Sequence, residues 1–193
     1  MGMLGYVFAA VCCVGVATEA WFTVRKRSKV PSPSDVTLSP LFIYIPVAVS
    51  AAVAFALKLA PGTRALGGIT TLSPGMGLVG CAIIVLGLAI RWRAVATLGQ
   101  QFTVDGRITP GHKLVETGLY GVVRHPSYLG ALLEYVGVGV ALENWISLLV
   151  MFLFPTIAQL YRISCEERVL LRHFGSAYRS YMRRTKKLIP GIF

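Results

Sequence analysis

Charged side chains are scarce in this sequence. They make up 14% of its 193 residues, whereas an average soluble domain has about a quarter. Apolar residues reach 55%, and the mean hydropathy is +0.67. So apolar a composition excludes a disordered chain and an ordinary water-soluble enzyme. The length is that of one domain.

Acidic residues, histidines and cysteines are few as well, at eight, three and four. The cysteine spacings match neither a disulfide framework nor a metal site, so we interpret them as small buried hydrophobic residues: Cys12, Cys13, Cys81 and Cys165. A metal centre built from His112, His125 and a glutamate matches no common ligand spacing. The sequence therefore predicts no metal.

Long apolar segments predict membrane helices. There are five of them, at residues 3–24, 41–60, 73–98, 128–142 and 145–161. Positive charge follows the first segment, whereas a cleaved signal peptide carries it in front, so we expect this helix to be retained. A linker rich in proline and serine occupies 28–40. Only Glu143 and Asn144 separate the last two segments, which predicts a helical hairpin.

The basic residues are distributed unevenly. If the first helix runs from outside to inside, 17 of the 19 lysines and arginines lie on the inner side, and only Lys58 and Arg64 do not. This positive-inside pattern explains the net charge of +11 without nucleic acid. It predicts a multi-pass membrane protein with its C-terminus in the cytoplasm, in the cell membrane of a prokaryote or the endoplasmic reticulum of a eukaryote.

The predicted fold is thus all-α, with about five transmembrane helices and a cofactor site at the cytoplasmic face. We divide the chain into a three-helix transmembrane region, 1–98, and a catalytic region, 99–193. The second region comprises an interfacial loop, the helical hairpin and a basic, partly helical tail. We expect that tail, 162–193, to contact anionic lipid.

A glycine-rich string, Gly75-Met-Gly-Leu-Val-Gly80, fits the dinucleotide-binding pattern. That pattern requires a preceding strand, whereas this string opens a predicted membrane helix. We therefore interpret its glycines as positions of close helix packing.

Polar groups that could perform chemistry gather in two inner segments. The first contains Gly118-Leu-Tyr-Gly-Val-Val-Arg-His-Pro-Ser-Tyr-Leu-Gly130, in which the proline suits the first turn of a helix. The second contains Cys165-Glu-Glu-Arg168, just past the predicted fifth helix. A hairpin returns both strings to one face, so we expect four side chains to meet there: Arg124, His125, Glu166 and Glu167.

The ordered set of an Arg-His-Pro-x-Tyr-x-Gly string at 124–130, an apolar hairpin and paired glutamates at 166–167 resembles the isoprenylcysteine carboxyl methyltransferases. Further strings at 112–120, 174–181 and 189–190 are similar too, so the resemblance covers about 98–193. It implies methyl transfer from S-adenosylmethionine, which leaves S-adenosylhomocysteine, to the carboxylate of a C-terminal prenylated cysteine or a similar lipophilic acid. The implied partners are this substrate and membrane lipids, without nucleic acid or an obligate protein partner.

The chemistry asks little of the protein beyond placement. A carboxylate is already a nucleophile at pH 7, so the enzyme must orient the reactants and exclude water. The resemblance implies that Arg124 holds the carboxylate and Glu167 orients Arg124 or favours the sulfonium, which makes these two the predicted catalytic residues. Cofactor contacts are predicted at Gln100, His112, Leu114, Tyr120, His125, Tyr128 and Glu166.

Other functions remain open at this point. A phospholipid (amine) methyltransferase and a sterol reductase that uses NADPH are similar in the same half of the chain. A transporter would place ionisable groups at mid-membrane. Glu134, in the fourth predicted helix, either lines a substrate cavity or is satisfied by a neighbouring helix.

Overall fold

The computed structural model describes residues 3–26, 41–60, 75–104, 108 and 111–193. Within these ranges the chain is helical and contains no strand, which confirms the all-α part of the predicted fold. The long helices are α1 (Met3–Arg25), α2 (Leu41–Leu59), α4 (Met76–Leu98), α5 (Pro126–Ala141) and α6 (Trp145–Phe174), followed by the shorter α7 (Ser176–Arg184). Two short 3₁₀ helices, η2 (Gly99–Gln101) and η3 (Gly118–Gly121), lie between α4 and α5. The predicted linker at 28–40 lies outside the described residues.

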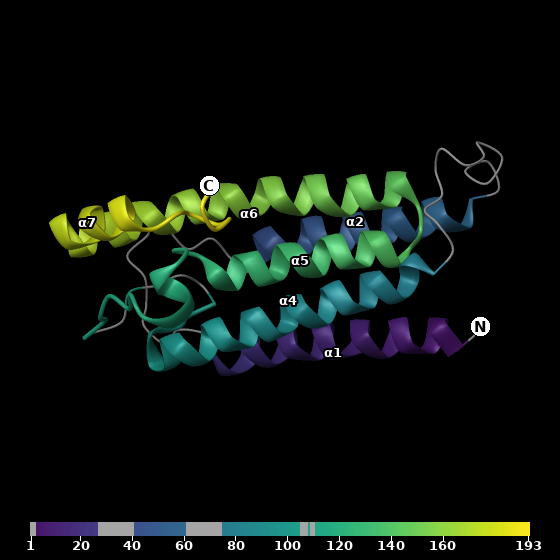
Figure 1. Cartoon of the computed structure of the whole chain (residues 1–193), viewed down its shortest axis with the longest axis horizontal. Coiled ribbons are helices and arrows are strands. Elements are labelled where there is room, and N and C mark those ends of the chain that lie inside the picture. The colour runs from purple at the N-terminus through teal and green to yellow at the C-terminus, as the bar shows by residue number, and fades with distance from the viewer. Residues whose placement is uncertain (1–2, 27–40, 61–74, 105–107, 109–110) are drawn as a thin grey trace.

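The long helices form an elongated bundle, and the polar loop and α7 lie together at one end of it (Figure 1). The most extensive packing is between α4 and α5, while α6 packs on both α2 and α5 and α1 packs on α4. Helices from both predicted regions thus share one bundle, and the division at residue 98 stays a prediction.

Four helices are long and apolar enough to cross a membrane: α1, α2, α4 and α6. The fifth, α5, has 16 residues, which is shorter than the roughly 20 that a straight crossing needs. Its status as a fifth span therefore stays a prediction. Large apolar side chains are exposed along α1, α2, α4 and α6, as a lipid-facing surface requires.

Glycines set the close approach of α4 and α5. A Cβ atom on Gly87 would lie 2.6 Å from the carbonyl oxygen of Gly130, and one on Gly80 would lie 2.6 Å from that of Gly137. Gly77 packs beside the side chain of Leu4 on α1. Glycine permits such backbone contact between membrane helices because it has no side chain. The interpretation of the glycine-rich string as a packing element is confirmed for Gly77 and Gly80, whereas Gly75 has no neighbour within 4 Å and starts α4 with a φ of 93°.

The predicted helical hairpin is confirmed, with a turn of three residues between α5 and α6. Asn144 caps α6, since its side-chain oxygen accepts a hydrogen bond from the backbone of Ser147 at 2.9 Å. Glu143 reaches across the same end of the bundle. It accepts from the backbone N–H of Gly77 at 3.1 Å and pairs with Lys58 at 3.8 Å.

One predicted boundary is wrong. The fifth helix was expected to end at 161, whereas α6 continues to Phe174. The helix persists because the sequence that follows, although polar, contains no proline or glycine before Gly175, which takes a positive φ of 56° and ends it. Glu166 and Glu167 therefore lie on a helix rather than beyond one.

Candidate functional site

The loop between α4 and α5 is tied to the end of the chain. Val123 and Lys186 form a parallel bridge, in which the backbone N–H of Arg124 donates to the carbonyl of Lys186 at 2.8 Å. The N–H of His125 donates to the carbonyl of Lys187 at 3.1 Å. These bonds fix the residues that precede α5 before any side chain is considered.

Aromatic residues of α7 complete this support. The Tyr181 hydroxyl donates to the carbonyl oxygen of Tyr120 in η3 at 2.7 Å, and both side chains are buried. Tyr178 is buried next to Tyr181, and their ring centroids lie 5.8 Å apart. Burial raises the pKa of Tyr120 and Tyr181 well above the usual value for tyrosine, so both hydroxyls stay protonated donors.

Three of the four residues predicted to meet are in contact, Arg124, His125 and Glu167, whereas Glu166 turns to other partners. Arg124 donates from Nε to Oε1 of Glu167 at 2.8 Å, and Nε2 of His125 lies 3.3 Å from the same oxygen. Arg124 also donates through Nη1 to the carbonyls of Met182 and Thr185. Its guanidinium is thereby held by α6 and by the residues around the end of α7.

Glu166 belongs to a second cluster on α6. Its Oε1 accepts hydrogen bonds from the hydroxyl of Tyr128 and from Nε of Arg162, the latter at 3.2 Å. Arg162 also donates through Nη2 to the carbonyl of Val104. Arg162 has a buried side chain, so its charge is balanced by the carboxylate one helical turn away.

A third cluster surrounds Arg91 on α4. Its guanidinium binds both carboxylate oxygens of Glu19 on α1, and Nη1 donates to the carbonyl and hydroxyl of Ser127, each at 3.1 Å. This contact depends on the close approach of α4 and α5 at Gly87 and Gly130, which we call the glycine crossing. Arg91 lies one turn beyond Gly87, and Ser127 lies about one turn before Gly130. The Tyr44 hydroxyl on α2 donates to Glu19 at 3.3 Å.

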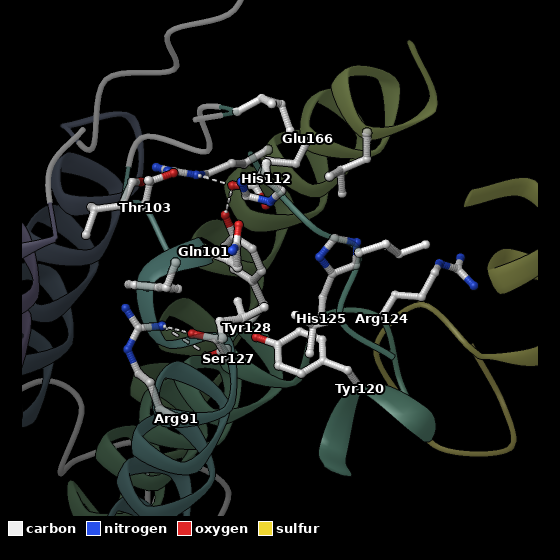
Figure 2. A pocket seen from close by; sticks show the side chains of 18 of the residues that line it. Arg91, Gln101, Thr103, His112, Tyr120, Arg124, His125, Ser127, Tyr128 and Glu166 are labelled. Atoms are coloured by element: carbon white, nitrogen blue, oxygen red, sulfur yellow. Dashed lines mark hydrogen bonds and ion pairs between the residues drawn. The ribbon is translucent and has the colours of Figure 1, made fainter. Parts of the chain in front are cut away.

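These clusters surround a cavity of about 170 Å³ at the polar end of the bundle. Figure 2 shows Glu166 and His112 on one side of it, Arg91 and Ser127 on another, and Tyr128 between them. The ring of His112 approaches that of Phe174, with 6.0 Å between their centroids. The wall therefore combines carboxylates, guanidinium groups, hydroxyls and flat rings.

Seven of the nine predicted site residues line this cavity: His112, Leu114, Tyr120, Arg124, His125, Tyr128 and Glu166. Glu167 is not among the lining residues, because it points to Arg124 and His125. Gln100 is exposed and also lies off the wall, and its neighbour Gln101 lines the cavity instead. Figure 2 shows the guanidinium of Arg124 directed away from the group around Tyr128.

The sequence reasoning missed two arginines on the cavity wall, Arg91 and Arg162. A signal existed for each. Arg91 and Glu19 are charges inside predicted membrane helices, where an ionisable group needs a partner. Arg162 stands four residues before Glu166, a spacing that forms an ion pair once the helix is known to continue.

His112 lies in the loop and is half-buried. Burial lowers its pKa below 6.5, and the nearby His173 lowers it further. His112 is therefore neutral at physiological pH. No group of three or more metal-ligating side chains occurs within the described ranges.

Comparisons with known proteins place this geometry in context. A model of the isoprenylcysteine carboxyl methyltransferase family matches residues 78–172. A protein-S-isoprenylcysteine O-methyltransferase B of Arabidopsis thaliana is 36% identical over 115 residues, which are 58% of this chain and 58% of that protein. The Schizosaccharomyces pombe enzyme of the same activity name is 34% identical over 113 residues, 56% of this chain and 47% of that protein.

A solved structure, that of a eukaryotic intramembrane Ras methyltransferase, superposes with a TM-score of 0.70 at 27% identity. The alignment covers 96% of this chain and 65% of the solved one. The sequence matches span about half the length of the curated relatives. The likeness extends over nearly the whole bundle, including helices that carry no recognisable motif.

Proposed function

The chain belongs to the isoprenylcysteine carboxyl methyltransferase family, and from this membership we propose that it methylates the carboxylate of a C-terminal prenylated cysteine, or of a similar lipophilic acid, at a membrane surface. The proposed methyl donor is S-adenosylmethionine. The observation that carries the proposal is the pair of Arg162 and Glu166 on the wall of one cavity, beside the hydroxyl of Tyr128.

The cavity wall fits such a donor. Glu166 supplies a carboxylate suited to the ammonium group of a methionine moiety. His112 and Phe174 supply flat rings suited to an adenine base, and the low pKa of His112 leaves that imidazole neutral beside a cationic donor. When bound, S-adenosylmethionine supplies an electrophilic methyl group.

The residues of the chain do the rest by placement. A carboxylate loses no proton when it attacks, so the site needs cations and exclusion of water rather than a general base. Arg162 is buried on the cavity wall and is the guanidinium proposed to hold the substrate carboxylate.

Arg124 and Glu167 receive a different role from the one first expected. The guanidinium of Arg124 is occupied by Glu167 and two backbone carbonyls. We assign this pair to positioning, because it fixes His125 and the start of α5, which carries Ser127 and Tyr128 into the cavity. Gln100 has no assigned role.

The proposed topology has five crossings, with the cavity on the cytoplasmic side. Its support is the alternation of helix ends. Lys26, after α1, donates to the carbonyl of Gly99, after α4, at 2.9 Å, whereas Lys58 of α2 meets Glu143 at the opposite end. The basic residues of α6 and α7 lie at the first of these ends, as the positive-inside rule requires of a cytoplasmic face.

Titration of the purified full chain in detergent tests the cofactor. We expect S-adenosylhomocysteine to bind and NADPH not to bind. NADPH binding alone would instead identify a reductase.

The substrate is tested by supplying a farnesylated cysteine analogue with a labelled methyl donor. Transfer only to phosphatidylethanolamine, with a rate that rises with pH as the amine deprotonates, would contradict the proposed acceptor.

A further inference from the structure

A second cavity, separate from the one that Glu166 lines, lies beside the end of α7. Its volume is about 340 Å³. We call it the basic groove, and it is lined by Arg124, Met182, Arg183, Arg184, Thr185, Lys186, Lys187, Ile192 and Phe193. Five of these nine residues are cationic, and none is acidic.

The cations of the basic groove are only partly neutralised. Glu167 pairs with Arg124 at 2.8 Å and with Lys187 at 3.6 Å, and Glu116 pairs with Arg184 at 2.8 Å. Arg183 and Lys186 are exposed and form no ion pair with any residue that the structure describes. Two positive charges therefore face the groove without a protein counter-ion.

The proposed topology places the groove near the membrane surface. The lipid-facing apolar side chains of α6 end at Tyr161, and α6 then continues for 13 residues, about 20 Å, to Phe174. The chain reverses there, and α7 runs back along α6 for about 13 Å (Figure 1). Beyond α7, Leu188 packs on Ile163 and Leu132. Ile163 lies two residues past Tyr161 along α6, so this contact lies close to the end of the apolar surface.

Two exposed apolar side chains line the groove beside its cations. Ile192 and Phe193 are 77% and 47% exposed, although they follow a basic segment. The turn that carries them is closed by hydrogen bonds from the N–H groups of Leu188 and Ile189 to the carbonyl of Phe193, each at 2.7 Å. Unpaired cations next to exposed apolar groups, at this depth, match an amphiphile with a negatively charged head.

We propose that the basic groove binds the phosphate headgroup of an anionic phospholipid, with Arg183 and Lys186 as its counter-ions and Ile192 and Phe193 against its acyl chains. This site shares only Arg124 with the wall of the proposed methyl-transfer cavity and does not depend on that activity. It anchors the segment that holds Arg124 and His125.

The test uses the purified full chain in detergent, titrated with dioleoylphosphatidylglycerol or with dioleoylphosphatidylcholine while the midpoint of thermal unfolding is recorded. We expect only the anionic lipid to raise the midpoint at low concentration. Replacing both cations, Arg183→Gln with Lys186→Gln, should weaken its affinity by about 30-fold. Without lipid, this variant should unfold at the wild-type temperature, because neither side chain is paired.

The matched control removes the same charge elsewhere, by Arg172→Gln with Arg179→Gln. Both side chains are exposed, and neither lines the groove. Equal weakening by the two double variants would overturn the proposal, since it would reveal a diffuse attraction. Equal stabilisation by inorganic phosphate, or by phosphatidylcholine, would overturn it too. Ile192→Ser, which changes no charge, should weaken the affinity for the anionic lipid several-fold.

Discussion

The guanidinium of Arg124 and the carboxylate of Glu167 meet at 2.8 Å although 43 positions separate them in the chain. Both side chains are buried, and His125 shares the same carboxylate oxygen. The contact joins the start of α5 to the far end of α6. It is the point at which the membrane hairpin and the polar loop become one structure.

Adjacent acids on α6 should respond differently to loss of charge. Glu167→Gln leaves Arg124 buried without a counter-ion, so we expect the free energy of unfolding to fall by about 3 kcal/mol. Glu166→Gln should change stability less and weaken the affinity for S-adenosylhomocysteine about tenfold, because Glu166 lines the cavity. Thermal unfolding and calorimetric titration measure the two effects. Identical behaviour of the two variants would contradict the assignment.

Substitutions of Arg162 and Arg124 should have different effects on activity and stability. Arg162→Lys replaces a planar fork with a point charge, so we expect methyl transfer to slow about 100-fold while cofactor affinity stays within a few-fold of wild type. Arg124→Lys should instead lower the unfolding temperature. At temperatures below that midpoint, the variant should keep most of the wild-type turnover. If Arg124→Lys lost more turnover than Arg162→Lys, Arg124 would be the carboxylate ligand after all.

The glycine crossing should tolerate no side chain. A Cβ atom on Gly130 would lie 2.6 Å from the carbonyl of Gly87 and 2.9 Å from Cβ of Arg91. We therefore expect Gly130→Ala to cost about 1–3 kcal/mol and to disturb the Arg91–Ser127 contact. Gly15→Ala is the control, since the nearest atom to its added Cβ would be a Glu134 oxygen at 3.7 Å. Equal unfolding temperatures for both variants would show that α4 and α5 can separate at no cost.

Two tyrosines of α7 form a matched pair. Tyr181→Phe removes a buried hydrogen bond to Tyr120, so we expect a loss of about 1 kcal/mol. The Tyr178 hydroxyl is buried with no hydrogen-bond partner in the described part of the chain. Tyr178→Phe should therefore be neutral or stabilising. Chemical denaturation of both variants decides, and a larger loss at Tyr178 would contradict the expectation.

His112 should make stability depend on pH. Burial, and then His173, lower its pKa in the folded chain below the ordinary value of 6.5. The unfolded chain thus binds more protons below pH 6.5, so the free energy of unfolding should fall as pH decreases from 6.5 toward the lowered pKa and stay constant above 6.5. His112→Gln should flatten this dependence, and His173→Gln should reduce it in part. A wild-type slope retained in His112→Gln would assign the effect to another group.

Local sequence was sufficient for the long apolar helices and for the hairpin. Apolar runs longer than a bilayer core must bury their backbone polar groups in helices, and the short turn at Glu143 and Asn144 leaves α5 and α6 no choice but a hairpin. The hairpin in turn brings Arg124 and Glu167 to one end of the bundle. These outcomes follow from periodicity, length and charge, which are properties of neighbouring residues.

Which side chains face the cavity was decided by tertiary structure. Glu166 and Glu167 are neighbours in sequence, yet helical geometry turns successive side chains by about 100°, so only one of them can line the same wall. That rotation is set by the contacts of α6 with α2 and α5 and of α5 with α4 at Gly87 and Gly130. Arg91 and Arg162 enter the site for the same reason, because close packing of distant segments, rather than any local pattern, determines what each side chain meets.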